Sequence, residues 1–305
     1  MNLLVWNCRG LKNQCTVKEL GKIIRAKDPF VVFLVKTWAN EARLDRVLHS
    51  INFDHKWEVS SGRRGGGLVL FWKRYANVTI EDSHRYFIDA TFDKNMETEW
   101  RFNGFYGEPK TNQRMEVWNK LKGLNNRPSI PWLCACDFNE ISKHDEKLGG
   151  VLRGHTQMQN FRDVIDECEF IDLRFEGPKF TWSKHFIDAH SIWERLDRGL
   201  VNSEFLLKYP TSKVSYLKCM SSDHVPIFIN LSGLEDPSRK KMFRFEEMCL
   251  SDSHCGETVE ATWRNGEEGD ILKKNKKVQQ RPGVVGEKLF WECEERVGGE
   301  KKIAS

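Results

Sequence analysis

The chain has 305 residues, of which 39% are hydrophobic and 11% aromatic. This length suits one large α/β domain or two small ones, and the apolar content excludes a wholly disordered chain. No apolar stretch approaches the roughly 20 residues that a membrane-spanning helix needs. The start of the chain, residues 1–7, lacks the basic and apolar regions of a signal peptide. We therefore expect a protein of the nucleus or cytoplasm that is neither secreted nor membrane-spanning.

Nine cysteines and a net charge of +4 add little to these limits. Cys8, Cys134 and Cys136 lie in apolar, strand-like runs, where a free thiol behaves as a small hydrophobe. Cys134 and Cys136 are too close for a zinc knuckle and no matching second pair follows, so we expect a reducing compartment and no structural zinc. The basic excess lies before Glu235. This agrees with a modest phosphate-facing surface.

Strands and helices alternate at the start of the chain, and a series of strands follows. Hydrophobic spacing predicts a strand over residues 3–8, a helix over 17–26, a buried strand over 31–35 and a second helix over 41–51. The next apolar runs read as an antiparallel series of strands over residues 55–60, 67–72, 78–80, 86–92 and 100–106.

Helices return in the second half of the domain. We expect helices over residues 113–124, 157–169 and 203–208, with strands over 132–136, 179–182, 192–196, 213–217 and 225–231. This mixed order excludes a simple doubly wound sheet and favours two sheets packed face to face with helices outside. The pattern fades after residue 231. Residues 1–232 therefore form the predicted domain, and residues 233–305 a charged tail that is partly helical or disordered.

Polar clusters follow several of the predicted strands, where loops present site residues on a rigid scaffold. An Asp-x-Asn after an apolar strand is, alone, more often a turn or helix cap, and a lone Asp-His is more often surface chemistry. Together they supply the hard oxygen ligands and the imidazole of a metal-assisted phosphodiesterase. The clusters are Asn7, Tyr106, Asp137 with Asn139, Asp197, and Asp223 with His224.

In this order and spacing the clusters resemble the endonuclease/exonuclease/phosphatase (DNase I-like) superfamily. The runs WNCRGLKNQCTVKEL, GGGLVLFW, FTWS, RLDR and SDHVPI are typical of the apurinic-type endonuclease domain of plant LINE-type (non-LTR) retrotransposons. The similarity covers residues 1–232, and the FRFEEM run at residues 243–248 resembles the linker that follows this domain in such elements. The resemblance does not extend to the reverse transcriptase of these elements. It implies a four-layered α/β sandwich that nicks DNA and uses Mg²⁺, with Mn²⁺ as a possible substitute.

The resemblance also implies roles for individual residues. Asn7 and Asp223 would hold the metal, and Asp137 and Asn139 would orient the attacking water and contact the phosphate. His224 would bind the phosphoryl oxygens.

Three further roles follow from the same resemblance. Asp197 would fix the tautomer of the imidazole of His224, as a carboxylate does beside a catalytic histidine. Tyr106 would face the phosphate or the leaving oxygen, and Thr181 would offer a phosphate-binding hydroxyl. A strand threonine that makes a local hydrogen bond is the alternative for Thr181.

One position departs from the family pattern. The second family motif ends an apolar strand with Glu-Thr, and the Glu is the principal Mg²⁺ ligand; here Lys36 precedes Thr37. Mg²⁺ needs oxygen ligands, so an ammonium at this position should reduce metal affinity steeply. The alternative is that Lys36 lies on the solvent face of an edge strand. A smaller departure is Cys136, which stands where the family usually has Gly.

Three functions are compatible with these residues. The first is a DNA endonuclease with weak or lost activity, the second a catalytically inactive DNA-binding remnant, and the third a phosphatase or phospholipase of the same superfamily. The Trp-rich, basic front half favours nucleic acid over small phosphoesters, so the expected partner is DNA, with no membrane and no obligate protein partner. Nuclear residence rests on that substrate, because the basic run at residues 273–277 is a weak import-type signal.

Overall fold

The computed structural model describes residues 2–60, 66–125, 130–184 and 191–232. The predicted tail, residues 233–305, and its basic run lie outside the described residues. None of the helices in the described part has the length and apolar character needed to cross a bilayer.

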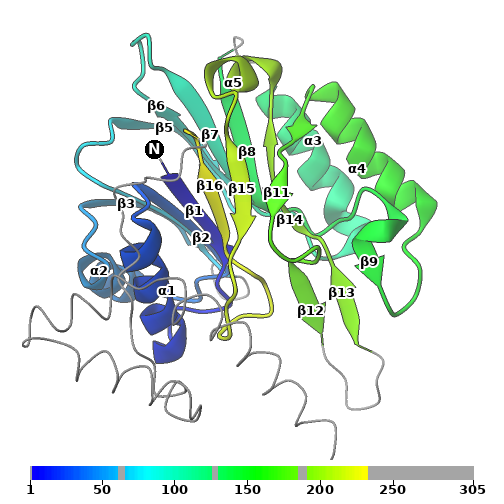
Figure 1. Ribbon diagram of the computed structural model, residues 1–305, viewed down its shortest axis with the longest axis horizontal. Coiled ribbons are helices and arrows are strands. Elements are labelled where there is room, and N and C mark those ends of the chain that lie inside the picture. Colours follow the sequence, from blue (N-terminus) through cyan, green and yellow to red (C-terminus); the bar gives the residue numbers. More distant parts are fainter. Residues whose placement is uncertain (1, 61–65, 126–129, 185–190, 233–305) are drawn as a thin grey trace, which may run out of the picture. The chain divides into compact units, whose positions relative to one another are not determined.

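The described residues contain a seven-stranded sheet in which β1 is central (Figure 1). Its β1 and β2 are parallel, while the pairs β2–β4 and β1–β16 are antiparallel. The parallel register sets Asn7 beside Val35, so the carboxyl ends of β1 and β2 reach the same edge. In spatial order the strands are β11 (Phe175–Glu176), β15 (Lys213–Tyr216), β16 (Ile227–Asn230), β1 (Asn2–Asn7), β2 (Val31–Val35), β4 (Leu68–Trp72) and β3 (His55–Val59).

A second sheet has six strands, and a small third sheet has three. The six strands in spatial order are β10 (Ile171–Asp172), β14 (Asp197–Val201), β8 (Trp132–Asp137), β7 (Trp100–Phe105), β6 (Phe87–Phe92) and β5 (Val78–His84). The third sheet is β12 (Trp182–Lys184), β13 (Ile192–Glu194) and β9 (Lys147–Leu148). Strands β7 and β8 are parallel, so their carboxyl ends also meet at one edge.

Three of the described helices begin at an asparagine that caps them. The side chains of Asn13, Asn40 and Asn202 accept hydrogen bonds from backbone N–H groups in the first turns of α1, α2 and α5, which satisfies donors that have no partner within the helix. The described helices are α1 (Gln14–Lys27), α2 (Glu41–Ser50), α3 (Arg114–Leu124), α4 (His155–Glu167) and α5 (Ser203–Lys208), with short 3-10 turns η2 (Thr111–Gln113) and η3 (His144–Glu146).

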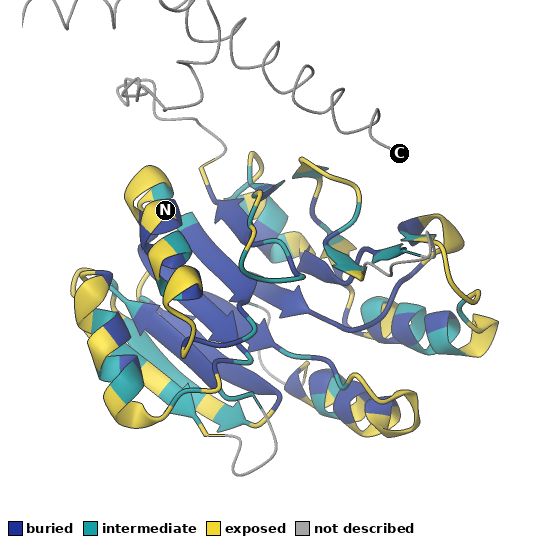
Figure 2. Cartoon of the chain, turned by 90° about the horizontal axis from the view of Figure 1, so that it is seen from below, coloured by how far each residue is buried: buried dark blue, intermediate teal, exposed yellow. Residues whose placement is uncertain are grey.

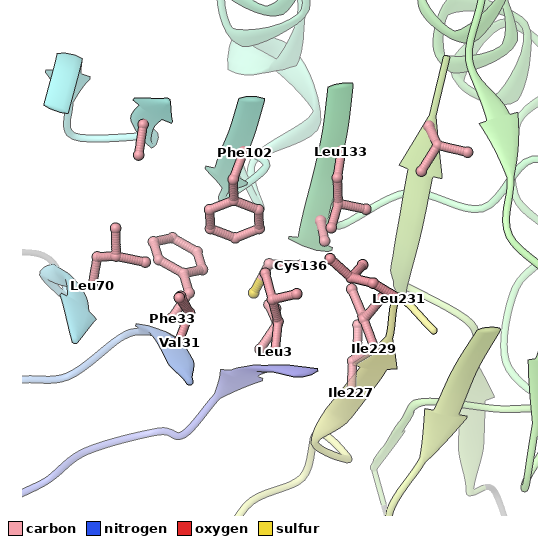
Figure 3. Packing of buried hydrophobic residues seen from close by; sticks show 14 of the residues in the cluster. Leu3, Val31, Phe33, Leu70, Phe102, Leu133, Cys136, Ile227, Ile229 and Leu231 are labelled. Carbon is pink, nitrogen blue, oxygen red and sulfur yellow. The ribbon is translucent and has the colours of Figure 1, made fainter. Parts of the chain in front are cut away.

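Three apolar clusters divide the described residues into four layers. The central cluster joins the two large sheets, for example Leu3 and Phe33 with Phe102 and Leu133 (Figure 3). A second packs α1 and α2 on the outer face of the first sheet, and a third packs α3 and α4 on the outer face of the second. Figure 2 shows the resulting pattern, with buried strands between helices whose outer faces are exposed. The predicted four-layered α/β sandwich is confirmed.

Three details of the predicted strands are wrong. The strands expected as one antiparallel series are divided, because β3 and β4 belong to the first sheet and β5, β6 and β7 to the second. The strand expected over residues 179–182 begins only at Trp182, and β14 was not anticipated. Local periodicity identifies strands but carries no information on which strand each will pair with.

Candidate active site

The polar clusters predicted at strand ends meet where the two sheets bring their carboxyl ends together. Asn7 is the last residue of β1 and Asp137 the last residue of β8. The Nδ2 group of Asn7 donates to Oδ2 of Asp137 at 2.8 Å, which joins the two sheets across the site. Both side chains are fully buried. The side-chain oxygen of the same amide, Oδ1 of Asn7, has no hydrogen-bond partner within the described residues.

Asn139 is fixed by the turn that follows β8. Its backbone N–H donates to Oδ1 of Asp137 at 2.9 Å, and its Nδ2 group donates to the carbonyl of Gly107 at 2.7 Å. An aspartate that accepts from the N–H two residues on forms an Asx-turn, so the predicted turn and the predicted site are the same feature. The two carboxylate oxygens of Asp137 are thereby held in one orientation.

His224 lies between two carboxylates. Its Nδ1 is 2.9 Å from Oδ2 of Asp197, and its Nε2 is 3.6 Å from Oδ2 of Asp137. The first contact is a hydrogen bond that fixes the tautomer, with the proton on Nδ1 in the neutral ring, and the second is too long to be one. Burial alone would lower the pKa of His224, but the charges of Asp197 and Asp137 outweigh it and raise this pKa above 6.5.

Asp197 is buried beside that imidazole. Burial raises the pKa of Asp197 above its ordinary value, and the neighbouring charge of Asp137 adds to this effect, while His224 opposes it. The hydroxyl of Thr181 accepts hydrogen bonds from the N–H groups of Leu196 and Asp197, both at 2.9 Å. Thr181 is only 1% exposed. These contacts are the local hydrogen bonds that were the alternative for Thr181, and its contact with phosphate stays a prediction.

The loop that carries Asp223 and His224 is held from three sides. The carboxylate of Glu19 in α1 accepts from the N–H groups of Met220 and Ser221, each at 2.9 Å. The hydroxyl of Ser222 donates to the carbonyl of Asn7, and the indole of Trp6 donates to the carbonyl of His224 at 2.9 Å. The imidazole therefore does not depend on its own side-chain contacts alone for its position.

Asp223 is already bound to two donors. Arg9 forms an ion pair with its Oδ2 at 2.7 Å, and the indole N–H of Trp182 donates to the same oxygen at 2.8 Å. Its Oδ1 has no hydrogen-bond partner in the described part of the chain. The predicted metal ligand is thus paired with an arginine.

Lys36 lies in the site and not on the solvent face of an edge strand. It directly follows β2, which has neighbours on both sides. Its Nζ lies 5.1 Å from the centre of the Tyr106 ring. Burial lowers the pKa of Lys36, while the nearby charge of Asp137 raises it and that of Arg9 lowers it. The edge-strand alternative is therefore excluded.

Tyr106 follows β7 and faces the same region. Burial raises the pKa of its phenol, and the charge of Asp137 adds to this. Its N–H donates to the carbonyl of Tyr86 at 2.7 Å. The phenol is therefore neutral at physiological pH and can donate one hydrogen bond to a bound oxyanion.

Four non-glycine residues around this site have positive φ angles. Arg9, Lys36, Cys136 and Asn139 have φ angles of 48°, 53°, 138° and 54°. Non-glycine residues adopt positive φ only when their surroundings enforce it, and such residues gather at functional sites. The φ of Cys136 also supplies a physical reason for a glycine at this position in related proteins.

The possible metal ligands in this site do not suit a divalent cation. Ligand atoms of Asp137, Asp197 and His224 lie within 4.8 Å of one another, but Nδ1 of the imidazole is hydrogen-bonded to Asp197, and Nε2 lies 3.6 Å from Asp137. The unpartnered oxygens of Asn7 and Asp223 would accept a cation. Mg²⁺ is usually held by one or two carboxylates with several waters. Here Lys36 stands at the position of the expected glutamate, and the carboxylate of Asp223 is paired with Arg9. The positive charges of Lys36 and Arg9 therefore oppose metal binding.

The structure brings together the predicted residues Asn7, Tyr106, Asp137, Asn139, Asp197 and His224, with Asp223 and Thr181 at its margin. Sequence reasoning missed Arg9, Trp182 and Glu19. Arg9 and Trp182 belong to the motifs WNCRG and FTWS, in which a neighbouring residue received the role. No sequence signal marks Glu19, because its contact with Met220 joins distant parts of the chain.

Comparisons with known proteins agree with this arrangement. A family model described as the endonuclease/exonuclease/phosphatase family matches residues 4–224. No curated protein matches the chain.

Solved structures with the same fold each align with 75% of this chain. They include the endonuclease domain of TRAS1, a telomere-specific non-LTR retrotransposon (13% identity, TM-score 0.54, 97% of that chain). An AP endonuclease from Leishmania major has 18% identity and a TM-score of 0.56 over 86% of its length. A 3′ phosphatase from Neisseria bound to a product DNA hairpin has 16% identity and a TM-score of 0.56 over 98%. Identities this low establish the fold alone.

Proposed function

The chain belongs to the endonuclease/exonuclease/phosphatase family, and from this premise we propose that its site binds the DNA backbone and nicks it weakly. The proposed activity is that of a retrotransposon-type endonuclease, which hydrolyses one phosphodiester bond of a strand. Nuclear residence would follow from this substrate. The observation that carries the proposal is the position of His224, whose ring nitrogens face Asp197 and Asp137.

His224 would act on the phosphoryl group as an electrostatic stabiliser or acid. Its pKa is raised by Asp197 and Asp137 despite its burial, so the imidazole carries a proton over a wider pH range than a free histidine. A cationic donor aimed at the position where negative charge develops lowers the barrier of an in-line displacement. Asp197 acts through His224 and holds its tautomer.

Asp137 and Asn139 would position the attacking water and the phosphate. The Asx-turn holds one oxygen of Asp137, and Asn7 holds the other, so the carboxylate cannot rotate. Tyr106 would donate its phenolic proton to a phosphate or leaving oxygen. A reacting group held in one orientation avoids the entropy cost of ordering it during the reaction.

Lys36 is the reason for weak activity. Mg²⁺, or Mn²⁺ in its place, would supply electrostatic stabilisation of the phosphate, and the residues around Lys36 hold it poorly. Two unit charges about 4 Å apart interact by about 4 kcal/mol at an effective dielectric of 20. Replacing a negative ligand by a positive one therefore weakens metal binding by an energy of at least this order. The same residue favours the second candidate function, a DNA-binding protein with no effective hydrolysis.

A plasmid-nicking assay in Mg²⁺ tests the proposal. The unchanged chain should convert supercoiled plasmid slowly, Lys36→Glu should nick faster, and His224→Ala should be inactive in both backgrounds. Robust nicking by the unchanged chain that Lys36→Glu does not improve would contradict the proposed role of Lys36. If the unchanged chain and Lys36→Glu are both inactive but bind DNA with an affinity that falls as salt rises, the DNA-binding alternative holds.

A further inference from the structure

The ammonium of Lys36 has no anionic partner of its own. Within the described residues, Lys36 forms no ion pair, although Asp137, Asp223 and Asp197 are close enough to influence its pKa. Asp223 is paired instead with Arg9. The Lys36 ammonium lies over the ring of Tyr106, 5.1 Å from the ring centre. Three N–H donors of a half-buried cation are therefore open to a ligand.

The backbone holds Lys36 firmly in this position. The N–H groups of Thr37 and Trp38 donate to the carbonyls of Gly67 and Gly66, at 3.3 and 2.9 Å. Gly66 packs so closely that a Cβ there would collide with the Lys36 main chain and lie 2.7 Å from its Cγ. A cation on a fixed backbone loses less conformational entropy on binding than one on a mobile loop.

Lys36 also faces open space. It lines a cavity of about 380 Å³ together with Tyr106, Arg85 and Lys110. Arg85 lies over the ring of Tyr86, with its guanidinium carbon 4.5 Å from the ring centre. Three basic side chains and one carboxylate, that of Glu108, line this cavity, so its lining is net positive. Such a lining suits an extended anion, and a DNA strand is such an anion.

We propose that Lys36 takes the place of the divalent cation as the phosphate-binding charge, so that this protein holds DNA without any metal ion. The inference rests on the proposed DNA function and makes it specific. An ammonium binds phosphate as a point charge through up to three N–H donors, and a partly buried position strengthens the attraction. Phosphate binding by a metal ion is thus replaced by phosphate binding by a permanent side-chain charge. The contribution that a metal would make to hydrolysis is lost.

DNA binding with and without metal tests this inference. A fluorescent DNA duplex should bind the full chain with the same affinity in EDTA and in Mg²⁺. Lys36→Met should weaken binding in EDTA about tenfold, as expected for one lost charge-assisted hydrogen bond, and should reduce the salt slope by about one. Lys36→Arg should retain metal-free binding. Lys36→Glu should lose binding in EDTA and regain it on addition of Mg²⁺.

Lys27→Met is the matched control, since it removes the same charge at the far end of the first sheet. Lys27 ends α1, and the nearby Phe30 N–H donates to Asn2, the first residue of β1. This control should bind DNA like the unchanged chain. Binding by the unchanged chain that requires Mg²⁺, or an unaltered affinity and salt slope in a folded Lys36→Met, would overturn the inference while leaving the DNA function in place. Absence of binding by the unchanged chain under both conditions would refute the DNA function itself, and this inference with it.

Discussion

Asp137 and Asp197 are cross-strand partners in the antiparallel register of β8 and β14. Two buried carboxylates directly opposite each other repel, and the arrangement is stable only if a positive group neutralises them. His224 meets this need from the loop that precedes β16, with Nδ1 at 2.9 Å from Asp197 and Nε2 at 3.6 Å from Asp137. The strand register therefore explains both the position of the imidazole and its raised pKa.

Asp197→Asn should lower the pKa of His224. Burial remains in this variant and opposes protonation, while one of the two charges that raise the pKa is lost. Histidine NMR resonances followed against pH measure the effect directly. Asp223→Asn is the control and should lower this pKa less, because its charge contributes less than those of Asp197 and Asp137. Equal shifts in the two variants would show that the hydrogen bond to Asp197 does not set the pKa.

The same pair predicts the sign of a stability change. Because the pKa of His224 in the folded state lies above 6.5, protonation of His224 stabilises the fold fully below pH 6.5, and this contribution disappears as pH rises through the folded pKa. Urea unfolding should therefore show that Asp197→Asn loses more stability at pH below 6.5 than in the alkaline range. A stability loss that is the same at every pH would argue against an ionic role for the pair.

Glu146→Gln should destabilise the fold and flatten its acid transition. Glu146 accepts from Arg195 at 2.9 Å and from Arg198 at 2.7 Å. Burial alone would raise the pKa of Glu146, but these arginines and the N–H of Ser142 lower it to about 2. The stabilisation that the ionised carboxylate gives to the fold is present above the ordinary pKa of 4.5 and is lost as pH falls toward 2. Removing one partner of a buried ion pair costs roughly 3–5 kcal/mol.

Urea unfolding at neutral and acid pH measures this loss. Glu176→Gln is the control, since the Glu176 carboxylate is 63% exposed in its ion pair with Lys213. Exposed pairs contribute about 0–1 kcal/mol, so this variant should remain close to the unchanged chain. If Glu146→Gln were no more damaging than Glu176→Gln, the arginine network would not be a source of stability.

Gly104→Ala should destabilise the contact between the two large sheets. A Cβ at Gly104 in β7 would lie 2.5 Å from Cδ2 of Phe33 in β2, and the ring is enclosed by the central core. Overpacking of this kind costs about 1–3 kcal/mol. Gly123→Ala is the matched control, because nothing lies within 4 Å of its added Cβ in α3. Helix propensity predicts that it stabilises by about 0.5–1 kcal/mol. Chemical denaturation of both variants should give opposite signs.

Cys136→Gly should be better tolerated than Cys134→Gly. Both cysteines are fully buried in β8, and Figure 3 shows Cys136 among the side chains between the sheets. Cys136 has a φ of 138°, whereas the φ of Cys134 is not positive. Glycine relieves strain only at Cys136, which is worth about 1–3 kcal/mol. The difference in unfolding free energy between the two variants should be of that size, and equal losses would mean that position 136 carries no strain.

The sequence by itself determined most of the individual elements and indicated the chemistry of the site. Alternation and helical spacing are local properties, so β2 and α5 could be predicted with the bounds observed. The polar residues at strand ends indicated phosphodiester chemistry. The resemblance to the family marked Lys36 as the exception, because an ammonium cannot bind a metal.

Only the tertiary structure decided which strand ends meet. The register of β8 on β14 places Asp197 opposite Asp137. The ion pair of Arg9 with Asp223 joins two loops that are far apart in the sequence. The hydroxyl of Thr181 accepts from the backbone beside Asp197 for the same reason. These contacts arise from long-range pairing, in which a shift of one residue would turn every side chain to the other face, and no local pattern encodes that choice.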